Sequence, residues 1–136
     1  MAFVADNSVV VAWFVESQAS VETRALLDRA GEDDVHVPCI WRAEFAAALL
    51  GLSHNRRLPP ARIPAILQAV EGLEFVHDAG PASTGTLIDL ARRHALNAYD
   101  ACYLELALRL KCPLAARDAP LRKAAERAGV LLAARS

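Results

Sequence analysis

Phe-Val-Ala-Asp-Asn-Ser, residues 3–8, is the stretch from which the fold is most readily predicted. Its three apolar residues show no polar alternation, which is typical of a short strand buried on both faces. Asp6, Asn7 and Ser8 follow at once, and all three residue types favour the start of a helix. Ligands of open α/β sheets bind at the carboxyl ends of the strands. The carboxylate at this junction therefore marks a candidate site.

The rest of the chain alternates strands with helices. Short apolar stretches predict further strands at 35–37, 73–76, 113–116 and, at a sheet edge, 130–133. Helical patterns predict helices at 9–15, 21–30, 39–52, 61–71, 84–94, 97–110 and 119–128. This alternation predicts an α/β fold, a three-layer α/β/α sandwich around a central parallel sheet. Because no linker or repeat interrupts the pattern, residues 1–136 are expected to form one domain.

The composition limits the classes of protein to consider. The chain has 136 residues, 54% of them hydrophobic, which is enough for one packed core and argues against disorder. The net charge of −1 provides no overall positive field, so any nucleic-acid binding must come from a local patch. We find no apolar run of about 18 residues and no signal-peptide pattern, and therefore expect a cytoplasmic protein with no membrane contact. The three cysteines are expected to be buried and apolar: Cys39, Cys102 and Cys112.

Four acidic residues stand out by their positions. Asp6 and Asp118 each end a predicted strand and open a helix. Glu44 and Asp100 each lie in an otherwise apolar stretch of a helix. Taken singly, each has a plain interpretation as a helix cap, a complement to the helix dipole or a solvent-facing side chain. Right-handed crossovers nevertheless bring the carboxyl ends of parallel strands to one edge, where three of these acids are predicted.

Carboxylates that converge in a poorly hydrated cleft need a positive charge between them. The only lysines, Lys111 and Lys123, lie outside these motifs. A divalent cation is the natural alternative, and ligands made only of oxygen select Mg²⁺ or Mn²⁺ over zinc. The four histidines are scattered and lack the spacing of a zinc site.

The motifs around these acids carry a family resemblance along essentially the whole chain. An apolar strand ends in Asp6 with Ser8 two residues later, and Trp41–Phe45 with the following alanines contains Glu44. Tyr99–Leu104 and Leu114–Asp118 contain the other two acids. In order and spacing these four motifs resemble those of PIN-domain ribonucleases, in particular the VapC-type toxins of bacterial toxin–antitoxin pairs. Asn7 and Arg117 are less typical of that pattern, but neither change removes an acid.

The resemblance implies a metal-dependent endoribonuclease that hydrolyses RNA phosphodiester bonds. In such an enzyme one or two Mg²⁺ or Mn²⁺ ions would be held by Asp6, Glu44, Asp100 and Asp118. Ser8 would orient Asp6 or a water molecule near the metal. Arginines expected to contact RNA are Arg56, Arg57, Arg92, Arg93 and Arg117. The family further implies a cognate antitoxin over the active cleft and a toxin homodimer.

Two other classes of function remain open from the sequence. The chain could be a non-catalytic RNA- or protein-binding module of PIN-like fold. It could also be an aspartate-based phosphatase or phosphoacceptor domain of similar topology. The phosphatase pattern requires a second Asp two residues after the first, where this chain has Ser8, and the phosphoacceptor pattern requires a lysine after a late strand. We therefore expect a nuclease in preference to either alternative.

Overall fold

A four-stranded parallel sheet forms the centre of the molecule. The computed structural model describes residues 1–80 and 82–132. The strands run in the spatial order β3-β2-β1-β4, and every neighbouring pair is parallel. Their bounds are Ala2–Ala5 for β1, Asp34–Val37 for β2, Val76–His77 for β3 and Leu114–Ala115 for β4. The predicted α/β class with a central parallel sheet is confirmed.

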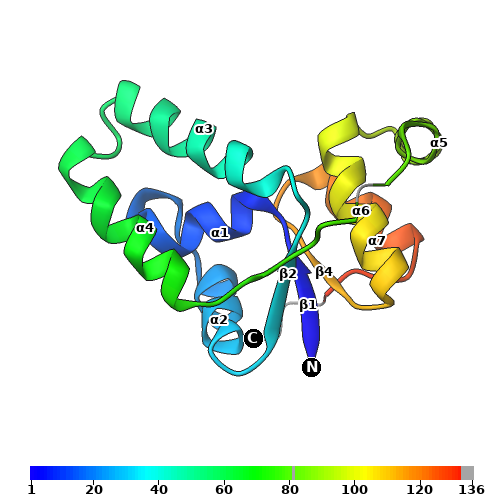
Figure 1. The fold of residues 1–136 in the computed structure, drawn as a ribbon, viewed down its shortest axis with the longest axis horizontal. Coiled ribbons are helices and arrows are strands. Elements are labelled where there is room, and N and C mark those ends of the chain that lie inside the picture. Colours follow the sequence, from blue (N-terminus) through cyan, green and yellow to red (C-terminus); the bar gives the residue numbers. More distant parts are fainter. Residues whose placement is uncertain (81, 133–136) are drawn as a thin grey trace.

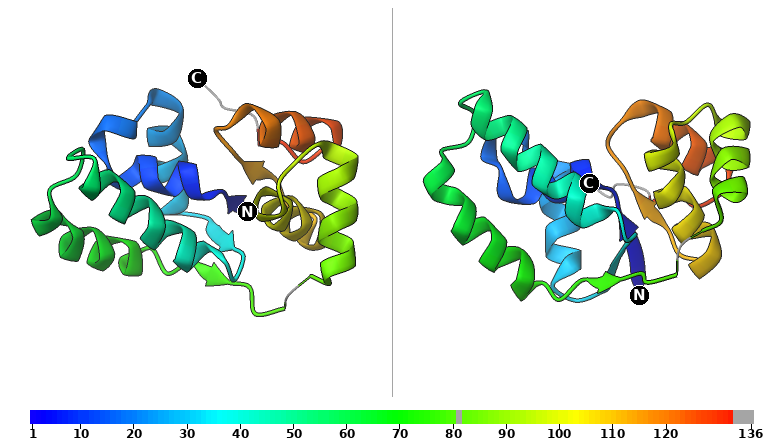
Figure 2. Two further views of the ribbon diagram at one scale, coloured as in Figure 1. Left: turned by 90° about the horizontal axis from the view of Figure 1, so that it is seen from above. Right: turned by 45° about the horizontal axis from the view of Figure 1, so that its top comes forward.

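Seven α-helices among the described residues cover the two faces of the sheet. On one side lie α1 (Asn7–Phe14), α2 (Val21–Ala30), α3 (Trp41–His54) and α4 (Ile63–Gly72). On the other side lie α5 (Thr84–His94), α6 (Ala98–Leu110) and α7 (Ala119–Arg127). Both the view along the short axis and the rotated views show this three-layer arrangement (Figures 1 and 2). Short 3₁₀ turns at Glu16–Gln18 and Pro60–Arg62 complete the described elements.

The core forms where the sequence is most continuously apolar. Phe3, Val4 and Ala5 of β1 are completely buried, as expected for a strand with helices on both faces. Helix α6 packs against β1, and its buried face includes Leu104. Trp41 is also a core residue, since its ring stacks on Phe45 at a centroid distance of 5.0 Å. No helix in the described ranges combines the length and the apolar character that crossing a membrane requires.

Some boundaries differ from the sequence-based predictions, and each difference has a local cause. The third strand begins at Val76 and not at Leu73, because Glu74 has a positive φ of 53° that turns the chain between α4 and the sheet. In the predicted strand 130–133, Leu131 makes one isolated bridge to Leu114, and residue 133 lies outside the described residues. The expectation of three buried cysteines is wrong: Cys39 is exposed, because it lies in the turn before α3, and Cys102 and Cys112 are only half-buried.

Candidate active site

The order of the strands fixes the place of the site. From β1 the chain adds β2 and β3 on one side, and β4 lies on the other side. The direction of winding therefore reverses between β1 and β4, and in open α/β sheets a ligand crevice forms outside such a switch point. The two strands are paired up to their ends, where the Asp6 N–H donates to the Ala115 carbonyl oxygen at 3.0 Å. Asp6 follows β1 and Asp118 follows β4 by three residues, so both acids lie at the switch point.

Asp6 is a helix cap as well as a site residue. Its Oδ1 accepts the backbone N–H of Val9 at 2.9 Å and the hydroxyl of Ser8 at 2.8 Å. The residue is 3% exposed. Burial raises the pKa of Asp6 to about 7, and the carboxyl group of Asp118 adds to the rise through its charge and by a hydrogen bond to the protonated form. The Ser8 hydroxyl is thus bonded to Asp6, and its role in orienting this acid toward a metal stays a prediction.

Asp118 links Asp6 to Asp100. Asp118 caps α7, where its Oδ2 accepts the Leu121 N–H at 3.3 Å. Asp100 lies in the first turn of α6, which is capped by Asn97. Burial, together with the charges of Asp118 and Glu44, raises the pKa of Asp100 to about 6. The carboxyl group of Asp118 is therefore a direct neighbour of two other acids that come from different elements.

Glu44 is held in place from both sides of the crevice. It lies in the first turn of α3, at the carboxyl end of β2. Its Oε1 accepts the hydroxyl of Tyr103, from α6, at 2.6 Å. Its backbone carbonyl accepts the Nδ2 of Asn7, from α1, at 3.2 Å. Burial and the bond to Glu44 raise the pKa of Tyr103 well above its usual value, so the hydroxyl stays protonated and donates.

The hydrogen bonds that Tyr103 and Asn7 form with Glu44 were not predicted from the sequence. Tyr103 is 2% exposed and follows Asp100 by three positions, which places both on one side of α6. That spacing was the available signal, but a tyrosine in an apolar stretch is usually a core residue. Asn7 was noted only as an untypical residue of the first motif. Its Oδ1 is buried and has no hydrogen-bond partner among the described residues.

The four acids suit a hard divalent cation by their chemistry, although no ready-made cage is formed. Across residues 1–80 and 82–132, no three His, Cys, Asp or Glu side chains are gathered as metal ligands. In the same part of the chain none of the four acids pairs with Lys, Arg or His. The pKa values of Asp6 and Asp100 are raised first by burial and then by the charges of neighbouring acids. An all-oxygen donor set that lacks a counter-charge fits Mg²⁺ or Mn²⁺, and the four-ligand site stays a prediction.

The arginines predicted to contact RNA are all exposed. Arg56 and Arg57 lie in the turn after α3, and Arg92 and Arg93 lie in the last turn of α5. Arg117 immediately precedes Asp118 and is therefore the arginine nearest to the acids along the chain. None of the five contributes to an ion pair in the described residues. Their guanidinium groups are available to phosphates, but their role in RNA binding stays a prediction.

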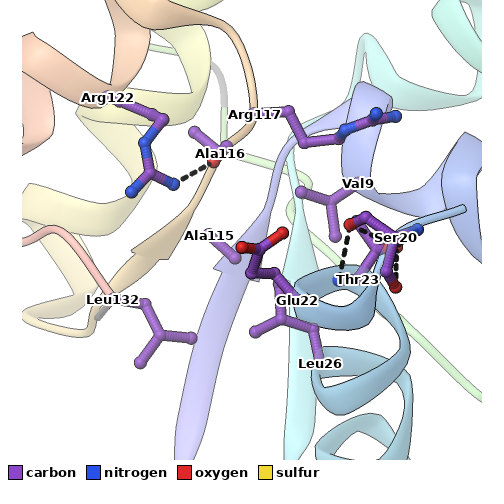
Figure 3. Close-up of a pocket in the computed structure, with 10 residues that line it drawn as sticks. All are labelled: Val9, Ser20, Glu22, Thr23, Leu26, Ala115, Ala116, Arg117, Arg122 and Leu132. Atoms are coloured by element: carbon purple, nitrogen blue, oxygen red, sulfur yellow. Dashed lines mark hydrogen bonds between the residues drawn. The ribbon is translucent and has the colours of Figure 1, made fainter. Parts of the chain in front are cut away.

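A cavity of about 300 Å³ lies between α2 and the end of β4, and Val9 of α1 and Arg117 are among its lining residues. Figure 3 shows that the Arg122 guanidinium is turned toward the Ala116 carbonyl oxygen, to which it donates at 2.8 Å. The side chain of Glu22, from α2, lies near the centre of the same view. Arg117 extends away from Arg122 in the same view (Figure 3). None of the four acids lines this cavity, so it is a neighbour of the candidate active site and not the site itself.

Comparisons with known proteins bear on the family and on the fold. The family model described as PIN domain matches residues 3–127. The crystal structure of PAE2754 from Pyrobaculum aerophilum superposes with a TM-score of 0.71 at 19% sequence identity, covering 91% of this chain and 84% of that chain. At this identity the likeness shows the fold alone. No curated protein matches the chain.

Proposed function

We propose, from the premise that this chain belongs to the PIN domain family, that it is a Mg²⁺- or Mn²⁺-dependent endoribonuclease and the toxin of a type II toxin–antitoxin pair. The PIN domain is generally a nuclease fold. The observation that supports the proposal is that Asp6 and Asp118 follow the neighbouring strands β1 and β4, at the switch point of the sheet. The pKa of Asp6 and of Asp100 is raised chiefly by burial and further by neighbouring acids, and perturbed carboxyl groups of this kind are typical of functional sites.

The chain's own residues would divide the work of RNA hydrolysis. Bound cations would polarise the scissile phosphate, promote attack by water and stabilise the leaving oxygen. Asp6, Asp100 and Asp118 would hold them, with Asp6 kept in one orientation by the Ser8 hydroxyl. Glu44 would be presented to the same crevice by the Tyr103 hydroxyl.

The proposed site would have to bind RNA although the chain has no strongly positive surface. The net charge is −1, so few phosphate contacts are expected and the choice of RNA would depend on its shape or on single-stranded loops. Arg117, beside the acids, is the favoured phosphate contact. Arg56 and Arg57 are exposed in the turn that follows α3 and would extend the contact with RNA.

A cognate antitoxin and a toxin homodimer are further parts of the proposal. An apolar cavity of about 580 Å³ lies between α3 and α4, with Phe45, Leu67 and Phe75 among its lining residues. Leu67 is 48% exposed, and Leu50 on α3 is 66% exposed. Apolar side chains exposed on neighbouring helices suit a protein partner. Sedimentation of the purified chain, alone and after co-expression with its neighbouring gene product, tests both associations.

Cleavage of a panel of structured RNAs, including tRNAs, tests the catalytic proposal. The parent chain should cut with Mg²⁺ or Mn²⁺ and should stop when EDTA is added. Asp100→Asn should lose cleavage and keep its fold, because an amide oxygen is a poorer ligand for a hard cation than a carboxylate. Asp89→Asn, on the exposed face of α5, is the matched control and should cut like the parent.

The outcome also separates the remaining alternatives. If Asp100→Asn cuts RNA within about threefold of the parent, Asp100 only complements the helix dipole, a contribution of about 0.3–1 kcal/mol, and the four-acid assignment fails. RNA binding without cleavage in any metal would favour the non-catalytic module. Phosphate release from a phosphorylated Asp6 would favour the aspartate-based phosphatase.

A further inference from the structure

A second cavity, of about 360 Å³, opens directly beside the acids between α1 and α3. It is lined by Asn7, Ser8, Val11, Gln18, Ala48, Gly51, Leu52, Asn55 and Arg117. Its volume falls in the range of about 300–1,000 Å³ that is usual for small-molecule sites. The mechanism proposed above does not use this space.

The lining of this cavity follows from helix geometry. Ala48, Gly51, Leu52 and Asn55 are spaced i, i+3, i+4 and i+7, so they form one stripe along α3. Glu44 lies one turn earlier on the same stripe. The rise of about 1.5 Å per residue puts Gly51 about 10 Å along the helix from Glu44. Asn7 and Ser8 follow Asp6 directly and Arg117 precedes Asp118, so the lining of the cavity adjoins two of the acids and lies within the reach of one nucleotide.

The chemistry of the lining suits a flat ring with a polar edge. Val11, Ala48 and Leu52 supply apolar walls, while Gln18 and Asn55 supply amide groups that both donate and accept hydrogen bonds. Asn and Gln side chains are established partners of base edges, and unpaired bases are recognised along their Watson–Crick and Hoogsteen edges. Arg117 is the only charged residue of the lining and can contact the attached phosphate.

We propose that this cavity between α1 and α3 binds an unpaired nucleobase next to the phosphodiester bond that is cut, and so determines sequence preference. A base inside a duplex is stacked and cannot enter, so the substrate would be a loop or a single strand. The inference rests on the proposed ribonuclease function for its substrate class. Its test does not depend on cleavage.

Gly51 provides a direct way to fill the cavity. A Cβ added at this position would meet no neighbouring atom within 4 Å, so the side chain of Gly51→Leu starts in open space beside the cavity. Gly85, in the first turn of α5, also has nothing within 4 Å of an added Cβ and does not line the cavity. Gly85→Leu is therefore the matched control. Both changes replace a helical glycine and should maintain or raise the melting temperature.

Binding of the four 5′-mononucleotides to the full-length, metal-free chain is measured by NMR titration, with ribose 5-phosphate and inorganic phosphate as the comparison ligands. The nucleotides should shift the amide signals of Val11, Gly51 and Asn55 saturably and bind at least tenfold more tightly than ribose 5-phosphate. Gly51→Leu should weaken nucleotide binding at least tenfold, and Asn55→Ala should change the order of preference among the bases. Gly85→Leu should bind like the parent.

Equal affinity for nucleotides and ribose 5-phosphate would overturn the proposal, because the site would then recognise phosphate alone. Unchanged nucleotide binding by Gly51→Leu would overturn it as well. These results are independent of nuclease activity: a chain that binds bases but cuts no RNA would refute only the proposed function. A nuclease whose base preference on a single-stranded RNA pool survives Gly51→Leu would refute only the base site.

Discussion

Replacing Asp6 by Asn should stabilise the metal-free protein, and the gain should grow with pH. Asp6 is 3% exposed, and its pKa is raised from 3.8 to about 7, first by burial and then by Asp118. Asn resembles the protonated acid in shape, and its Oδ1 can still accept from the Val9 N–H and the Ser8 hydroxyl. The substitution therefore removes a buried charge and keeps the helix cap.

The raised pKa of Asp6 determines how the stability of the parent changes with pH. The folded state keeps a proton on Asp6 that the unfolded state has lost, so the parent loses stability as pH rises from 3.8 toward 7. Each pKa unit corresponds to about 1.4 kcal/mol, which gives a total cost on the order of 4 kcal/mol at pH 8. Roughly 2–3 kcal/mol of that cost arises between pH 5 and pH 8.

Urea unfolding in EDTA at pH 5, 6, 7 and 8 measures this difference. We expect the free energy of unfolding of Asp6→Asn to exceed that of the parent by several kcal/mol at pH 8. At pH 5 this difference should be smaller by roughly 2 kcal/mol. Asp89→Asn, at an exposed position of α5, should follow the parent at every pH. The histidines with lowered pKa values, His77 and His94, titrate in all the proteins and cancel in the comparison. A difference that does not change with pH, or an Asp6→Asn protein that is less stable at pH 8, would refute the reasoning.

Four further outcomes are expected. Millimolar Mn²⁺ should stabilise the parent at pH 8, by about 1.4 kcal/mol at ten times its Kd, and an unchanged melting temperature would count against a preformed site. Tyr103→Phe should lower single-turnover cleavage about tenfold with little change in fold, because Glu44 loses a bond to a charged group worth about 1.5–3 kcal/mol; parent-like turnover would contradict the positioning role. Arg109→Ala should cost about 1–3 kcal/mol in urea unfolding, since Glu105, 8% exposed, loses its partner, and adding Glu105→Gln should restore most of the loss. Arg117→Ala should reduce the slope of log affinity for RNA against log salt by about 1, whereas an unchanged slope would remove Arg117 from the phosphate contacts.

Much of the fold could be predicted because its signals are local. The continuous apolar run of β1 predicted a doubly covered strand, and Phe3 is completely buried. The acids after β1 and β4 were predicted at one sheet edge from the handedness of crossovers alone. The order of the strands was not predicted, although it is the order that makes β1 and β4 neighbours. Strand order depends on which distant segments pair, and no local pattern carries that information.

The contacts that complete the candidate site could not be predicted for a related reason. The hydrogen bond from Tyr103 to Glu44 joins residues 59 positions apart, and its pattern in the sequence is that of an ordinary core tyrosine. The cavity beside the acids likewise exists only because α1 packs against α3. The stripe that contains Gly51 is visible in the sequence, but what faces that stripe is decided by tertiary packing.

The acids at Asp6, Asp100 and Asp118 have opposite effects on stability and on the proposed function. Asp6, Asp118 and the neighbourhood of Asp100 are helix starts, and two of these acids cap their own helices. An N-cap contributes about 0.5–2 kcal/mol, which Asn would supply equally well at both positions. The charge that distinguishes Asp from Asn is costly at these positions in the metal-free fold, because the pKa is raised for both Asp6 and Asp100, first by burial and then by neighbouring acids. Asn or Ser at these helix starts would supply the same caps without that cost, and the carboxylates at these positions are therefore the feature on which the proposed cation site rests.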